Sequence, residues 1–142
     1  MAELIFQKML CERGVADLFT VASSATSREE IHGGVGNPIY PPAQKELLRH
    51  GITPQKRQAV QLLPSDYDRY DLFIGMDERN VQNMLRIFGR DPQKKIRKLM
   101  DCTARGGDVA DPWYTDRFDI TYRDIEEGCT ALLDACLTEY NQ

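Results

Sequence analysis

The spacing of apolar residues along the chain predicts a long helix near each end. Over residues 1–13 the apolar side chains fall on one stripe of a helix, and Gly14 is suited to end it. Near the C-terminus the same three- and four-residue steps predict a longer helix. The apolar positions are Ala2, Ile5, Phe6, Met9 and Leu10 in the first helix, and Tyr122, Ile125, Cys129, Leu132, Leu133 and Cys136 in the second.

Two further helices are predicted between these from the residues that begin and end them. Pro41-Pro42 suits the first turn of a helix that would close at His50-Gly51. Asp77 suits the capping position of another helix, which would end at Gly89. A short helical turn is also expected to begin at Pro64.

Short apolar runs between the helices predict β-strands. Residues 72–76 form the clearest run, residues 19–22 indicate a buried strand, and residues 96–100 indicate a third. Residues 58–62 are weakly extended, and residues 26–40 are expected to form a long loop. Strands that alternate with helices favour a parallel sheet covered on both faces. We therefore expect one α/β domain over residues 1–142, built as a three-layer sandwich.

The order of these elements is unusual because it opens with a helix. A doubly wound α/β fold normally opens with a strand, and its first strand-to-helix turn binds phosphate at the N-terminus of the helix. The pattern therefore predicts that this first strand and this turn are missing from the sequence.

Charge and composition narrow the possible partners. The 142 residues carry a net charge of −4, which argues against binding to nucleic acid, since phosphate backbones are held by clustered Lys and Arg. The basic run 94–98 is interrupted by an isoleucine and is typical of a solvated strand edge. The sequence has no signal peptide and no apolar run near the length of a membrane span. We expect a cytoplasmic protein without a membrane or nucleic-acid partner.

The cysteines are expected to be reduced thiols. Cys11, Cys102, Cys129 and Cys136 lie in a chain without a secretion signal, where disulfides are rare. Cys129 and Cys136 are two helical turns apart on one face and are most simply core residues. No cysteine has metal-site spacing with a histidine, so we expect neither a metal nor another cofactor.

One short motif carries candidate chemistry. In Asp111-Pro112-Trp113-Tyr114 an acid stands before a proline and two aromatic rings. Alone, the motif is better explained by a loop turn and a core tryptophan than by a catalytic acid. Its order and spacing with other segments resemble the low-molecular-weight protein tyrosine phosphatase family along nearly the whole chain. These segments are Met1-Ala2-Glu3, Glu12-Arg13-Gly14, Ser23 to Ser27, Arg49-His50-Gly51-Ile52, the run from Tyr70 to Asp77, and Asn80.

The resemblance implies hydrolysis of phosphotyrosine in protein substrates through a cysteinyl-phosphate intermediate. In this family backbone N–H groups and an arginine stabilise the phosphate oxygens. The leaving phenolate has an intrinsic pKa of about 10, so an acid must protonate it. By resemblance Asp111 is that general acid and Pro112 stiffens its loop. Trp113 and Tyr114 would form the walls of a slot for the flat ring of the substrate.

The sequence departs from the family at the nucleophile. The family carries Cys-(five residues)-Arg-(Ser/Thr)-Pro directly before the Met-Ala-Glu start of its first helix. Here the residue six positions after each cysteine is never arginine, so the nucleophile and the loop arginine are absent from these 142 residues. The residues found there are Asp17, Asp108, Ala135 and Gln142. The resemblance therefore predicts a chain that is inactive as given. Glu29 and Glu30 also stand where the family often has an aromatic pocket wall.

Several functional interpretations remain open. The chain is a phosphatase whose start lies at an internal methionine, or a non-catalytic pseudophosphatase that binds or regulates. The retained Asp111, Trp113 and Tyr114 favour the first. An arsenate reductase relative would need extra redox cysteines before the acid loop, where only Cys102 lies. An arginine phosphatase shares the fold, and the residue that separates it from a tyrosine phosphatase would lie in the absent loop. In-frame codons upstream of Met1 that encode the strand and the loop would show that the chain is part of a phosphatase.

The missing strand also predicts association between chains. In the family this strand sits between the one expected at 19–22 and the one at 72–76. Loss of about four buried apolar side chains would cost ~6–12 kcal/mol, against a usual domain stability of about 5–15 kcal/mol. Either the two strands beside the gap pair with each other, or another chain supplies strand partners. Because open strand edges recruit other strands and closing the gap would force the first helix to repack, we expect a homodimer or larger assembly.

Overall fold

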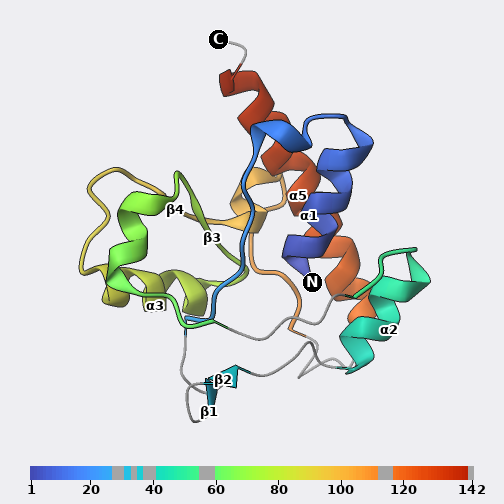
Figure 1. Ribbon diagram of the computed structural model, residues 1–142, viewed down its shortest axis with the longest axis horizontal. Coiled ribbons are helices and arrows are strands. Elements are labelled where there is room, and N and C mark those ends of the chain that lie inside the picture. The colour runs from blue at the N-terminus through green and yellow to red at the C-terminus, as the bar shows by residue number, and fades with distance from the viewer. Residues whose placement is uncertain (27–30, 33–34, 37–40, 55–59, 112–116, 141–142) are drawn as a thin grey trace.

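The computed structural model describes residues 1–26, 31–32, 35–36, 41–54, 60–111 and 117–140. The predicted helices are confirmed within one or two residues at most of their ends (Figure 1). They are α1 (Ala2–Glu12), α2 (Pro41–Arg49), α3 (Glu78–Phe88) and α5 (Phe118–Tyr140), with short 3₁₀ turns η1 (Ala16–Leu18), η3 (Pro64–Arg69) and η4 (Leu99–Cys102).

A parallel strand pair lies between the helices. β3 (Phe73–Gly75) pairs with β4 (Ile96–Lys98) in the register Phe73 with Ile96 and Gly75 with Lys98. β1 (Ile31–His32) and β2 (Val35–Gly36) form a separate antiparallel pair within the expected long loop. In the described residues the parallel sheet thus has two strands.

Successive residues of β3 face opposite helices, which produces three layers. Ile74 and the flanking Leu72 and Met76 pack against the core cluster built largely from α1, α5 and η4. Phe73 packs instead with residues of α3, including Met84. Figure 1 shows α3 on one side of the β3–β4 pair and α1 with α5 on the other. The expected α/β architecture, with helices flanking a parallel sheet, is therefore confirmed.

The prediction of a buried strand over residues 19–22 is wrong. Thr20 and Ala22 are exposed, and residues 19–22 form no strand. Backbone pairing begins only at Ala25, which donates its N–H to Val60 O and accepts from Leu62 N–H, in a parallel bridge opposite Gln61. A strand requires a hydrogen-bonded neighbour as well as an apolar run, and in the described residues 19–22 lack one.

The predicted strand 96–100 ends two residues early because the chain turns into η4. Leu99 and Met100 are almost fully buried there and pack against α5. The approach is very close at Gly128 of α5, where an added Cβ would lie 2.5 Å from Cγ of Leu99. A glycine at this helical position lets η4 and the strand before it lie directly on α5.

Candidate functional site

A surface hollow of about 420 Å³ lies where the segment ending at Asp111 meets the start of α3. It adjoins the carboxyl end of β3, which is the usual ligand position in open α/β folds. The hollow is lined by Asp77, Arg79, Asp108, Val109, Ala110 and Asp111.

The start of α3 is fixed by a side-chain cap. Asp77 has extended backbone angles, and its carboxylate accepts the N–H of Asn80 at 2.8 Å, as the sequence predicted for a capping aspartate. The remaining N–H groups of the first helical turn give this end a partial positive charge. At the border of the hollow this charge is met by carboxylates of the protein itself, because Asp77 and Asp108 both accept N–H groups of this turn.

Asn80 ties the end of β3 to a distant segment of the chain. Its Oδ1 accepts the N–H of Met76 at 3.0 Å, and its Nδ2 donates to Oγ1 of Thr26 at 3.4 Å. Asn83, one turn further along α3, also donates to Thr26 Oγ1 at 3.4 Å. Thr26 belongs to the Ser23–Ser27 segment of the family resemblance, so two parts of that resemblance meet on α3.

The segment before Asp111 is held against the sheet and α3. Val109 N–H donates to Met76 O at 2.9 Å, and Glu78 N–H donates to Asp108 Oδ1 at 3.2 Å. Lys98 of β4 forms an ion pair with the same oxygen of Asp108 at 3.0 Å. The hydrogen bond to Asp108 raises the pKa of the Lys98 ammonium group.

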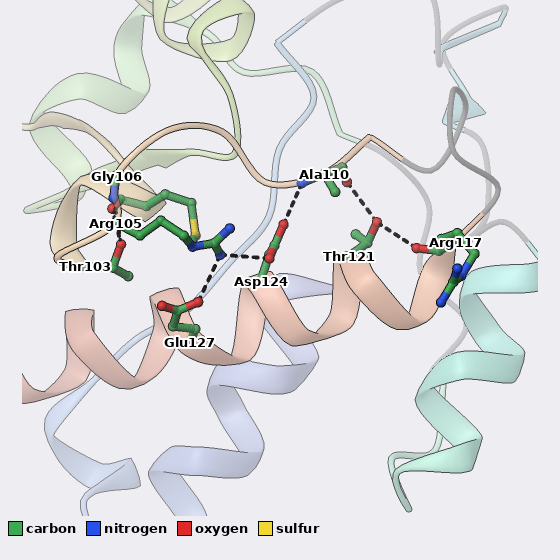
Figure 2. A network of polar contacts seen from close by, with 9 residues as sticks. Thr103, Arg105, Gly106, Ala110, Arg117, Thr121, Asp124 and Glu127 are labelled. Carbon is green, nitrogen blue, oxygen red and sulfur yellow. Dashed lines mark hydrogen bonds and ion pairs between the residues drawn. The ribbon is translucent and has the colours of Figure 1, made fainter.

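A second set of contacts joins this segment to α5, as Figure 2 shows. Asp124 Oδ2 accepts the N–H of Ala110 at 2.9 Å, and Thr121 Oγ1 donates to Ala110 O at 2.8 Å. Arg105 donates to Asp124 Oδ1 at 2.8 Å and to Glu127 Oε2 at 2.9 Å. These two hydrogen bonds raise the pKa of Arg105. Asp124 is only 8% exposed and Thr121 5%.

The structure places one of the predicted site residues and leaves the others untested. Asp111 lines the hollow and is partly buried. Trp113 and Tyr114, predicted as walls of a substrate slot, lie outside the described residues, as do Glu29 and Glu30. The roles of these residues remain predictions.

The cysteines lie elsewhere, and none of them lines the hollow. Cys129 is buried in the core, as predicted, and its burial raises the pKa of the thiol to about 12. Burial also raises the pKa of Cys102 and that of Cys136. A thiol that stays protonated is a poor nucleophile, so these three groups are not prepared for attack on a phosphate.

Neither a metal site nor a membrane-spanning helix is found in the part of the chain that the structure describes. Its His, Cys, Asp and Glu side chains form no group of three or more that could hold a metal ion. Its helices, including the long α5, are not long and apolar enough to cross a membrane.

Sequence reasoning missed Thr121, Asp124 and Arg105. The sequence did carry a signal for Thr121 and Asp124, because they stand directly before Tyr122 and Ile125 on the buried face of α5. Polar side chains at buried helix positions need hydrogen-bond partners, and that need points to a contact with another segment. Nothing in the spacing of Arg105 indicated its partners.

Comparison with known proteins gives one family. The low molecular weight phosphotyrosine protein phosphatase family matches residues 1–142. The low molecular weight protein-tyrosine-phosphatase PtpA of Staphylococcus epidermidis is 32% identical over 142 residues, which covers 99% of this chain and 87% of PtpA. YfkJ of Bacillus subtilis, of the same description, is 31% identical over 135 residues and covers 94% of this chain and 84% of YfkJ.

Solved structures show the same fold. The crystal structure of YfkJ superposes with a TM-score of 0.88 at 28% identity, over 97% of this chain and 86% of that one. The low molecular weight protein tyrosine phosphatase of Streptococcus pyogenes superposes with a TM-score of 0.80 at 30% identity, over 94% of this chain and 81% of that one.

Proposed function

The chain belongs to the low molecular weight phosphotyrosine protein phosphatase family, and on that premise we propose that it carries the acid-bearing part of an enzyme that hydrolyses phosphotyrosine in proteins. The observation that carries this proposal is the position of Asp111. Its segment meets the carboxyl end of β3, the usual ligand position in open α/β folds, and lies against the start of α3.

In this proposal Asp111 protonates the leaving phenolate oxygen. The attacking group is a cysteine thiolate, which takes the phosphoryl group and forms a cysteinyl phosphate that water then hydrolyses. The P–O bond to tyrosine breaks in the first step, and its electron pair goes to the phenolate oxygen, which receives the proton of Asp111. Trp113 and Tyr114 are proposed to flank the phenyl ring.

We further propose that the 142 residues have no phosphatase activity by themselves. No cysteine among them precedes an arginine at the family's spacing. The raised pKa values of Cys102, Cys129 and Cys136 support this, because each of these thiols is less easily ionised than usual.

The decisive experiment compares two forms of the chain in the hydrolysis of an aryl phosphate between about pH 5 and 7. One form is the 142-residue chain. The other carries roughly 15 further N-terminal residues that supply a strand of usual length and the Cys-(five residues)-Arg-(Ser/Thr)-Pro loop. We expect turnover only in the longer form, and its loss on replacement of the loop cysteine by serine.

Two results would contradict the proposal. Turnover by the 142-residue chain that disappears in Asp111→Asn would require a nucleophile within these residues. A folded longer form without turnover on phosphotyrosine peptides would reject tyrosine phosphatase activity. Phosphoarginine peptides assayed in parallel would then test the alternative substrate, which the family resemblance leaves open.

We also propose that the 142-residue chain associates, most simply as a dimer. In the described residues β3 has a strand partner on one edge only, and residues 19–24 have none. Open strand edges recruit strands from other chains. Light scattering across a dilution series should show a molar mass above that of the monomer. A cooperatively melting monomer at micromolar concentration would contradict the proposal.

A cytoplasmic location and a single domain over residues 1–142 complete the proposal. The free thiols at Cys11, Cys102, Cys129 and Cys136 support a reducing compartment.

A further inference from the structure

Three successive peptide groups before Asp111 are each held by a different contact. The N–H of Val109 is bonded to Met76 O at the end of β3. The N–H of Ala110 is bonded to Asp124, and the C=O of Ala110 is bonded to Thr121. Since each peptide group is planar, a bond to its N–H or C=O fixes the orientation of the whole plane.

The last of these planes contains the backbone nitrogen of Asp111. The C=O of Ala110 and the N–H of Asp111 belong to one peptide group, so the bond from Thr121 fixes where the Asp111 backbone begins. Thr121 and Asp124 stand three residues apart on one face of α5, and together they hold both polar groups of Ala110 (Figure 2).

Arg105 completes the arrangement by holding Asp124. The two oxygens of the Asp124 carboxylate are divided between Ala110 N–H and the Arg105 guanidinium. A buried carboxylate needs such an opposite charge. The segment that carries Arg105 is itself turned by Thr103, whose Oγ1 donates to Met100 O at 2.6 Å and accepts Gly106 N–H at 3.1 Å.

We propose that Thr121 and Asp124 are positioning residues for Asp111, and that Arg105 acts through Asp124. They fix the peptide planes before Asp111, so that its carboxyl group is presented to the hollow at one place. The inference rests on the proposed function for the role of Asp111 as a proton donor, whereas the hold on Ala110 is independent of that role. Proton transfer requires hydrogen-bond reach, and a misplacement of about 1 Å can lower a rate about 100-fold.

The first test measures the hold on Ala110 in the 142-residue chain by amide hydrogen exchange in NMR. Asp124→Ala should speed exchange of the Ala110 N–H on the order of tenfold or more, since a charge-assisted bond is lost. Asp124→Asn keeps an oxygen acceptor and should have a smaller effect. If Asp124→Ala fails to fold, exchange of the Ala110 N–H is measured in Asp124→Asn and Arg105→Gln instead.

A matched control lies on the same helix. Asp134 forms an ion pair with Arg13 at 2.6 Å, far from the acid segment. Asp134→Asn should leave Ala110 exchange unchanged. The fluorescence of Trp113, the sole tryptophan of the sequence and two residues beyond Asp111, should respond to Asp124→Ala and not to Asp134→Asn. Equal responses to both variants, or none to Asp124→Ala, would overturn the proposal.

The second test uses the form that carries the cysteine loop. Thr121→Val removes the hydroxyl donor at nearly constant shape, and Thr121→Ser keeps it. We expect Thr121→Val to lower kcat about 100-fold for an ester of a poor phenol leaving group and much less for an activated ester, with KM little changed. Thr121→Ser should restore the rate.

The outcomes separate the inference from the proposed function. Equal losses on both esters, or no rescue by Thr121→Ser, would show a merely structural role and overturn the inference. Absence of turnover in the unsubstituted longer form would reject the proposed function. If the Ala110 N–H exchanges at the same rate in Asp124→Ala as in the unsubstituted chain, Asp124 does not hold Ala110, whatever the activity.

Discussion

Replacement of Asp111 by alanine, in the form that carries the cysteine loop, should lower turnover about 100- to 10,000-fold for a phosphate ester with a poor phenol leaving group. A phenolate with a pKa of about 10 leaves slowly unless its oxygen is protonated as the P–O bond breaks. An activated phenol with a much lower pKa leaves readily as the anion. For its ester the loss should therefore be far smaller.

The measurement is kcat for a series of aryl phosphates, plotted against the pKa of the leaving phenol. Asp111→Ala should make the rate fall steeply with this pKa, while the unsubstituted protein shows little dependence. The control variant Asp134→Asn changes a carboxylate that is paired with Arg13 away from the hollow and should keep the shallow dependence. Parallel losses for all esters would reject Asp111 as the proton donor.

Leu99→Ala should reduce the free energy of unfolding by about 2–5 kcal/mol, because it empties a nearly fully buried position between η4 and α5. Gly128→Ala acts on the same contact from the other side. Its new Cβ would lie 2.5 Å from Leu99 Cγ, at a cost of about 1–3 kcal/mol, partly offset by the higher helix propensity of alanine, about 1 kcal/mol.

The double variant distinguishes this contact from a general loss of stability. With Leu99 shortened, the methyl group at position 128 occupies vacated space, so the double variant should be more stable than the two single losses imply, by about 0.5–3 kcal/mol. Denaturant unfolding at one fixed protein concentration measures all four forms, since association would make stability depend on concentration. Additive losses would show that the two side chains do not share the site.

The helices were predictable because their signals are local. Apolar residues at helical spacing placed α1 and α5, and the Asp77 cap and Gly89, with its positive φ of 80°, marked the ends of α3. The three-layer arrangement also followed, since residues on alternate sides of β3 are apolar and must face helices on both sides.

The strand expected at 19–22 shows where local signals fail. Phe19, Thr20 and Val21 are residue types enriched in strands, but whether they form a strand depends on a neighbour elsewhere in the chain. The structure describes these residues without such a neighbour, and Phe19 instead packs edge-to-face on Phe6 of α1, with ring centroids 6.0 Å apart.

The candidate site was predictable only as far as a linear motif reaches. Asp111 was identified from Asp-Pro-Trp-Tyr together with the family resemblance, and the structure places it at the hollow. Arg105 and Asp124 are 19 residues apart, and their contact depends on how η4 folds back onto α5. Sequence spacing does not predict that geometry. The contacts that hold the backbone before Asp111 could therefore be identified only from the structure.

The contacts that hold Ala110 join residues close in sequence, and this affects the entropy of forming them. Asp124 lies 14 residues from Ala110, whereas the Arg13–Asp134 ion pair between α1 and α5 spans 121 residues. The entropy lost on closing a flexible loop grows with the logarithm of its length, which makes the shorter closure more favourable by about 2 kcal/mol. The backbone before Asp111 is thus joined to α5 through a short loop that does not include α1.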